Sequence, residues 1–380
     1  MKITDVTQGM WRYMPVPESP EPFPEYIVKA EENAFFRVFG ASVRGKKHKY
    51  DGTNGDDFFD VDFADRVCIA AAADGAGSRR LSRIGARAAS KRAVESLKAS
   101  FFAIIEENPD FYDVLSGDMA SEAFSTLTGK IAASMRSAVN SAYEAVVSAF
   151  EERREKPEYE NPELTDFAST LLLSAAIPTK GGETLVISLT VGDGVVAVFG
   201  DSRENPLTIL SVGDKGEFAG ETEFLLSVSA RSDTSLKTRT RLTRRKADYS
   251  VLMTDGVSED YFPYSPELLR LIADLKLNRI LPIETSEKSE TDKKIPPPTV
   301  IPWVNDPDVK FTIADSKSLI AENEMSAADI YFDESLIFAA AQSQPLEKNA
   351  EDALAIWLDN YSERGSFDDR TLIIIIPKNQ

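Results

Sequence analysis

Acidic residues occur at four places in the sequence where a carboxylate stands beside an apolar segment. Two end an apolar run and precede a glycine, and two are acidic pairs that come shortly before an apolar run. The four places are Asp74, Asp255, the pair Asp56-Asp57 and the pair Asp368-Asp369. If strand ends bring them to one sheet edge, such close like charges cannot all ionise without cations. Oxygen-preferring Mg²⁺ or Mn²⁺ would relieve this repulsion, and two ions about 3.5–4 Å apart would suit phosphate-ester hydrolysis by a metal-activated water.

Each of these places is weak evidence when taken alone. Asp-Gly is a common turn dipeptide, and a chain with 62 acidic residues carries many surface aspartates by chance. Only the complete set, with predicted strands around it, indicates a site.

The composition limits the classes of function. Lysine and arginine total 43 against 62 aspartates and glutamates, so the formal charge is −19 and no general attraction for nucleic acid or an anionic membrane is expected. Cys68 is the only cysteine and His48 the only histidine, which excludes an internal disulfide and a zinc site built from these residue types. Cys68 lies in the apolar run 67–73 and is expected to be a buried, unreactive thiol.

No targeting or membrane signal is visible. Residues 1–6 lack the basic-then-apolar pattern of a signal peptide, and no stretch approaches the roughly 20 apolar residues needed to cross a bilayer. We therefore expect a soluble, cytoplasmic protein with neither nucleic-acid nor membrane partners.

Hydrophobic periodicity predicts strands on both sides of a helical pair. The expected strands are residues 35–43, 58–63, 66–73, 169–177, 184–191, 195–199, 207–211, 225–229, 249–254 and 371–376. Apolar residues at 3/4 spacing predict the helical pair around residues 94–105 and from 124 to 153. Further helices are expected at residues 265–277 and 349–361, and a polar loop at 46–57.

This order of elements predicts an α+β fold, an α-β-β-α sandwich in which two mostly antiparallel sheets lie inside and helices flank them. Residues 1–30, which hold a run of prolines, are expected to be an extended segment, and residues 31–380 a single domain. An irregular insertion is expected at about 280–345, where a charged run, three prolines and Trp303 occur.

Six short motifs in this order resemble those of the protein phosphatase 2C family, the metal-dependent Ser/Thr phosphatases, and its bacterial branch most of all. The motifs lie at residues 40–45 with 48 and 56–58, at 73–78 with 82–86, at 168–171 with 191–194, at 216–218 with 221–225, at 253–257, and at 365–371. The resemblance covers most of the chain, and the ordered set is far more specific than any one motif.

The resemblance implies a role for each acid. Asp74 would bridge two ions of Mg²⁺ or Mn²⁺, and Asp255 and Asp368 would complete the first metal site. Asp56 and the Gly75 carbonyl would serve the second site. A bridging water would attack phosphorus in line, without a covalent phosphoenzyme.

The same resemblance implies supporting groups. Asp57 and Asp369 would stand behind the metal ligands and hold them. Asp166 and Glu259 fall where some family members bind a third metal.

Three departures from the family pattern stand out. The histidine that many eukaryotic members place two residues after the bridging aspartate is Ala76 here, so protonation of the leaving group has no assigned residue. The arginine that usually binds the substrate phosphate has no clear counterpart. His48 stands in its place by spacing, with Arg44 nearby, and a lone histidine is equally consistent with a structural role. Asp56 stands where a glutamate is usual.

A basic cluster at Arg241, Arg244, Arg245 and Lys246 also stands out in so acidic a protein. A solvated loop is the favoured interpretation. The alternative is a flap beside the metal site that attracts an acidic, phosphorylated substrate segment.

The resulting expectation is a metal-dependent phosphatase that hydrolyses phosphoserine or phosphothreonine in proteins, with a partner kinase that it opposes. One alternative is a catalytically weak or inactive module with the same fold that binds phosphoproteins or regulates a partner. A phosphatase for a small phosphorylated metabolite is a third, weaker alternative.

Overall fold

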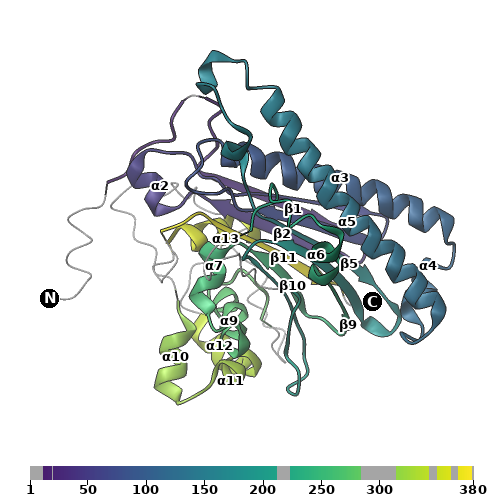
Figure 1. Cartoon of the computed structure of the whole chain (residues 1–380). Coiled ribbons are helices and arrows are strands. Elements are labelled where there is room, and N and C mark those ends of the chain that lie inside the picture. The colour runs from purple at the N-terminus through teal and green to yellow at the C-terminus, as the bar shows by residue number, and fades with distance from the viewer. Residues whose placement is uncertain are drawn as a thin grey trace.

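Two stacked β-sheets with helices on both outer faces make up the protein, as Figure 1 shows. The computed structural model describes residues 12–18, 20–211, 223–283, 314–341, 349–360 and 367–378. The predicted α+β sandwich is confirmed. Every paired strand in both sheets is antiparallel.

The first sheet has six strands. In spatial order they are β1 (Tyr26–Glu32), β2 (Phe36–Val43), β11 (Arg370–Pro377), β10 (Tyr249–Met253), β7 (Val195–Phe199) and β8 (Leu207–Ile209). The last strand of the chain, β11, therefore lies between two earlier strands.

The second sheet has five strands. In spatial order they are β3 (Phe58–Ala64), β4 (Val67–Ala73), β5 (Leu171–Pro178), β6 (Thr184–Val191) and β9 (Thr240–Arg245). Strands β4 and β6 are buried along their whole length, and β4 is apolar at every position because both of its faces are covered. Cys68 is fully buried in β4 as expected, and burial raises the pKa of its thiol.

The two long predicted helices cover the outer face of the second sheet. They are α3 (Ser82–Glu107) and α5 (Glu122–Glu151), which run beside each other in Figure 1 and pack through one apolar core with the sheet. Two short helices, α4 (Phe111–Ser116) and α6 (Asp233–Arg239), and three 3₁₀ helices complete this layer. The 3₁₀ helices are η1 (Pro157–Tyr159), η2 (Leu164–Phe167) and η3 (Lys180–Gly182).

Shorter helices cover the outer face of the first sheet. In chain order they are α7 (Asp255–Ser258), η4 (Glu259–Tyr261), α8 (Tyr264–Glu267), α9 (Leu269–Leu277), α10 (Ser316–Asn323), α11 (Ala327–Phe332), α12 (Glu334–Ala341) and α13 (Ala350–Asn360). Helices α9, α11 and α13 share an apolar core with the first sheet, while α10 and α12 pack on α9 through a small separate cluster. No helix within the described ranges is long and apolar enough to cross a membrane.

Three local predictions need correction. Residues 46–57 are not a loop throughout, because α2 (Lys46–Asp51) forms there between Gly45 and Gly52, and Gly52 ends the helix at a left-handed φ of 75°. Residues 225–229 form turns instead of a strand, since Leu225 packs into the helical core instead of extending a sheet. The basic residues at 241–245 lie on edge strand β9 and not in a loop.

Several expected features lie outside the described residues. They are Trp303 and the three prolines at 296–298, the motif at 216–218 with residues 221 and 222, and residues 365 and 366. The described part of the 280–345 region is mainly helical, and β1 begins at Tyr26, within the range expected to be extended. The proposed limits of the domain and the insertion remain predictions.

Candidate active site

The strand registers bring the four acidic places to one end of the two sheets. Phe58 of β3 pairs with Ala73 of β4, so the residues just before β3 and just after β4 are neighbours. Met253 of β10 likewise pairs with Leu372 of β11, which places Asp255 beside the pair Asp368-Asp369. In both cases one acid follows a strand and the other precedes its antiparallel partner.

Asp57 connects the two sheets at this end. Its Oδ2 accepts hydrogen bonds from Thr254 Oγ1 at 2.8 Å and from Thr371 Oγ1 at 2.7 Å. Its Oδ1 is buried and has no hydrogen-bond partner among the described residues. Burial, and then the charge of Asp369, raise the pKa of Asp57 well above its usual value.

Asp369 holds the loop that carries the first acidic pair. Its carboxylate accepts hydrogen bonds from the backbone N–H groups of Gly45, at 2.6 Å, and of Asp56. Asp56 itself lies beside Ser82 and Arg83, the first two residues of α3. Burial raises the pKa of Asp56 strongly, and the charge of Asp369 adds to this effect.

Asp74 is the acid around which the others gather. Its pKa is raised well above the usual value by burial, and then by the charges of Asp57, Asp255 and Asp368. The interaction with the Asp255 side chain also raises the pKa of Asp74 and lowers that of Asp255. Thr170 fixes the backbone here, since its Oγ1 accepts from Asp74 N at 2.9 Å and its N–H donates to Asp74 O at 2.8 Å.

Gly75 follows in a position where no side chain fits. A Cβ atom there would lie 2.7 Å from Asp56 O and 2.8 Å from the Ser82 carbonyl carbon. The glycine therefore lets the loop after Asp74 pass directly against the loop that carries Asp56.

His48 is buried behind the acids instead of facing solvent. Its Nε2 lies 3.5 Å from Asp369 Oδ2 and 3.8 Å from Asp56 Oδ2, and its Nδ1 shares a hydrogen bond of 2.7 Å with Thr53 Oγ1. His48, Asp368 and Asp369 each offer a ligand atom within 4.8 Å of the others.

Arg44 is a structural residue in this arrangement. Its side chain is fully buried and donates to the carbonyls of Met14, His48 and Thr53 and to Glu25 Oε1. These four bonds occupy its guanidinium with protein acceptors, so the geometry does not favour the expected contact with a substrate phosphate.

The two acids expected at a third metal lie in different surroundings. Glu259 is exposed in η4. The pKa of Asp255 is raised to about 6, mainly by burial and then by the charge of Asp193, and the charge of Glu259 makes a smaller contribution. Asp166 caps η2 and lies 3.4 Å from Arg80 Nη2. Asp193 was given no role from the sequence, although the Gly192-Asp193-Gly194 turn between β6 and β7 was a visible signal.

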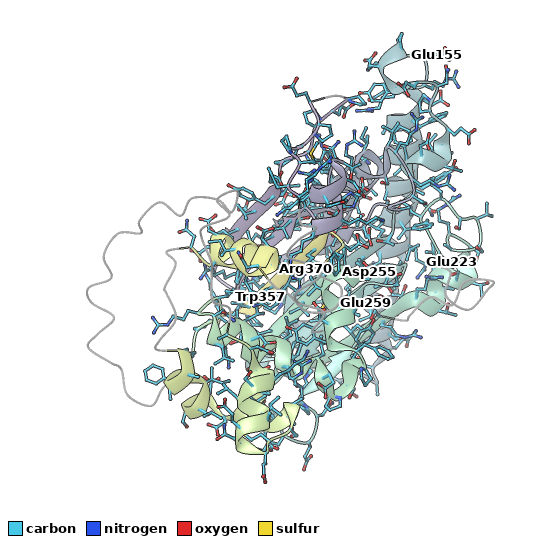
Figure 2. The ribbon with its side chains drawn as sticks, turned by 90° about the vertical axis from the view of Figure 1, so that its left-hand side faces the viewer. Glu155, Glu223, Asp255, Glu259, Trp357 and Arg370 are labelled. Carbon is cyan, nitrogen blue, oxygen red and sulfur yellow. The ribbon has the colours of Figure 1, made fainter. Side chains whose placement is uncertain are left out.

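The donor set fits hard divalent cations. Carboxylate oxygens converge, they raise one another's pKa values, and one buried oxygen of Asp57 lacks a hydrogen-bond partner. A divalent cation of the Mg²⁺ or Mn²⁺ class would supply the missing positive charge at such a set of oxygens. In Figure 2 the labels of Asp255, Glu259 and Arg370 lie close together near the middle of the view.

The solved structures to which the chain is similar include three phosphatases. A phosphatase from Toxoplasma gondii aligns over 93% of this chain and 96% of its own, with 11% identity and a TM-score of 0.43. Stp1 from Staphylococcus aureus covers 97% and 99%, with 12% identity and a TM-score of 0.34. The Ser-Thr phosphatase MsPP from Mycobacterium smegmatis covers 89% and 97%, with 15% identity and a TM-score of 0.33.

A comparison with curated proteins finds no match. The sequence model of protein phosphatase 2C matches residues 44–284, which is well over half of the chain and includes the acids at 56, 57, 74 and 255. Together with the two-sheet sandwich and the convergent carboxylates, this match shows that the chain belongs to the protein phosphatase 2C family.

Proposed function

We propose that this protein is a Mg²⁺- or Mn²⁺-dependent phosphatase that removes phosphate from phosphoserine and phosphothreonine in proteins. The observation that carries the proposal is the position of Asp74. Besides burial, the charges of Asp57, Asp255 and Asp368 all raise the pKa of its carboxyl group. Keeping so many carboxylates together without cations is unfavourable, which argues against a binding module that has lost its metal.

Each acid has a proposed task. Asp74 would contact both ions, Asp255 and Asp368 would complete the first site, and Asp56 with the Gly75 carbonyl would form the second. Bound ions would lower the pKa of a water molecule and neutralise charge on the phosphoryl group.

The supporting residues have separate tasks. Asp57 would hold the two sheets together through Thr254 and Thr371, and Asp369 would fix the loop before Asp56 through two backbone N–H groups. For a third ion, Asp193 would be a better second ligand beside Glu259 than Asp166. The charges of Asp193 and Glu259 both raise the pKa of Asp255, whereas Asp166 forms an ion pair with Arg80.

His48 has a different proposed task from the one its spacing suggested. Its ring is buried and directed at Asp56 and Asp369, so it would orient these two acids instead of binding the phosphate. Its Nδ1 contact with Thr53 holds the ring in that direction.

The test combines hydrolysis and metal binding. Hydrolysis of p-nitrophenyl phosphate and of phosphoserine and phosphothreonine peptides is measured with Mn²⁺, with and without chelator, and Mn²⁺ uptake is measured by calorimetry. We expect turnover that the chelator abolishes, and in Asp74→Asn a loss of turnover of at least about 100-fold, the size of effect that a misplaced reacting group causes.

Asp62→Asn is the matched control. Asp62 lies on β3 and pairs with Lys98 at 2.7 Å on the surface, so the same chemical change there should leave turnover unaltered. An Asp74→Asn variant with near-normal turnover would refute the site. Wild-type protein that takes up Mn²⁺ without turnover, but retains phosphopeptides, would favour the binding module.

A further inference from the structure

Arg370 lies directly after the last acidic pair and is almost completely buried. It is the first residue of β11, and its side chain contacts Gly256, the residue after Asp255. Its position in Figure 2 is close to Asp255 and Trp357, at the junction of the first sheet with its covering helices.

The Arg370 guanidinium donates to three acceptors, two in the continuous stretch of α7 and η4 and one in α13. Nε donates to Gly256 O at 3.0 Å, Nη1 to Leu358 O at 2.8 Å, and Nη2 to Asp260 Oδ2 at 3.1 Å. The group also lies 5.8 Å from the ring centre of Trp357. Since both side chains of the Arg370–Asp260 pair are at most 2% exposed, these bonds act without competition from water.

Backbone packing at the same point is very tight. A Cβ atom on Gly256 would lie 2.0 Å from Asp369 O and 3.4 Å from Arg370 Cγ. The backbone next to Asp255 therefore lies directly against the Asp369–Arg370 peptide, and Arg370 donates to the same glycine.

Helix α13 supplies the fixed point. Leu358 O belongs to its last turn, where carbonyls lack helical partners and favour a cation. The next residue, Asp359, forms an ion pair with Lys49 of α2, and both side chains are nearly buried. The last turn of α13 thus contacts α2, the helix before Asp56, and is connected through Arg370 to the segment that follows Asp255.

We propose that Arg370, anchored on the last turn of α13, is a positioning residue that sets the separation of Asp255 and Asp368 for a shared divalent cation. The proposal rests on the proposed metal-dependent function. A buried ion pair is weak evidence for stability, and here its value lies in geometry: a planar guanidinium holds three acceptors at fixed directions, which a lysine cannot do.

The test is Mn²⁺ affinity, measured by calorimetry on folded protein whose melting temperature is known. Arg370→Lys keeps the charge beside Asp260 but cannot maintain the three-way fork. We expect the dissociation constant for Mn²⁺ to rise about tenfold or more, as is typical when groups that orient metal ligands are altered.

Arg153→Lys is the matched control. Arg153 also pairs with a carboxylate, Glu21 at 2.6 Å, donates to a helix carbonyl, Ala149 O at 2.8 Å, and lies 5.9 Å from an aromatic ring, that of Tyr159. Figure 2 labels Glu155, two residues further on, at the end of the molecule far from Asp255. This variant should lose stability without changing Mn²⁺ affinity by more than about twofold.

Asp359→Asn provides a second arm if Arg370→Lys does not fold. It removes the partner of Lys49 on the same turn of α13, and Glu334→Gln, which removes the partner of Lys276 between α9 and α12, is its control. Unchanged Mn²⁺ affinity in folded Arg370→Lys, or equal affinities in Asp359→Asn and Glu334→Gln, would overturn the proposal.

The outcomes separate this proposal from the proposed function. Wild-type protein that binds Mn²⁺ but shows no turnover, while Arg370→Lys weakens binding, would support the positioning role and refute the phosphatase. Wild-type protein that takes up no Mn²⁺ would refute both.

Discussion

Gly256→Ala is the substitution for which the structure gives the clearest magnitude. The added Cβ would lie 2.0 Å from Asp369 O, whereas ordinary contact begins at 3.4 Å, so the two loops must separate by 3.4 − 2.0 = 1.4 Å or distort to a similar extent. The obstacle is backbone and cannot rotate away. Displacements of about 1 Å at a reacting centre can cost a factor of about 100 in rate.

We therefore expect Gly256→Ala to lower Mn²⁺-dependent kcat/KM for a phosphopeptide by about 100-fold or more. The displacement separates Asp255 from Asp368, so Mn²⁺ affinity measured by calorimetry should fall as well. The assay uses protein shown to be folded by circular dichroism.

Gly77→Ala is the control within the same site. Gly77 follows Asp74 by three residues, and a Cβ atom there meets no heavy atom within 4 Å. The control should keep wild-type kinetics. Full activity and metal affinity in Gly256→Ala would show that the contact between the two loops does not set the position of the acids.

Two further predictions concern stability. Phe101→Ala removes a fully buried ring from the core under α3 and should lower the free energy of unfolding by about 3–5 kcal/mol. Phe102→Ala, at a ring that is 48% exposed, should cost much less. Equal losses for the two variants in urea titrations would show that the core is assigned wrongly. Asp274 is fully buried, accepts hydrogen bonds from Tyr261 Oη and Ser316 N, and has a pKa raised to about 6, mainly by burial. Its folded pKa exceeds the unfolded value, so stability falls as the pH rises from about 4 through 6, by up to ~3 kcal/mol for this group. In Asp274→Asn the loss of unfolding free energy between pH 5 and pH 7 should be smaller than in the wild type by about 1 kcal/mol, and an identical pH dependence would contradict the raised pKa.

The sequence predicts the sheets well because their signal is local. Strand β4 is an unbroken apolar run and α5 repeats its apolar residues every three or four positions, so both follow from the periodicity of burial. Helix α2 was missed since its six residues are polar, and it is held by tertiary contacts such as the pair of Lys49 with Asp359, 310 residues apart in the sequence. Strand β9 was missed for a related reason. It lies at the edge of its sheet and none of its residues is fully buried, so its sequence is rich in arginine and lacks the apolar pattern that predicts a strand.

The acids proposed for the site are marked in the sequence by strand ends and glycines, but the residues that contact them are not. Arg370 lies within the last motif, but no role was predicted for it from the sequence, and only the fold shows that its three acceptors come from α7, η4 and α13. His48 shows the reverse case, since spacing suggested a substrate contact and burial directs the ring to Asp56 and Asp369. The proposed metal ligands lie at strand ends, so each stands beside an apolar run that can be seen in the sequence. A residue that positions these ligands acts through contacts with distant parts of the chain, and such contacts have no pattern in the local sequence. The roles proposed for Arg370 and Asp57 therefore rest on their contacts in the fold and not on a sequence pattern.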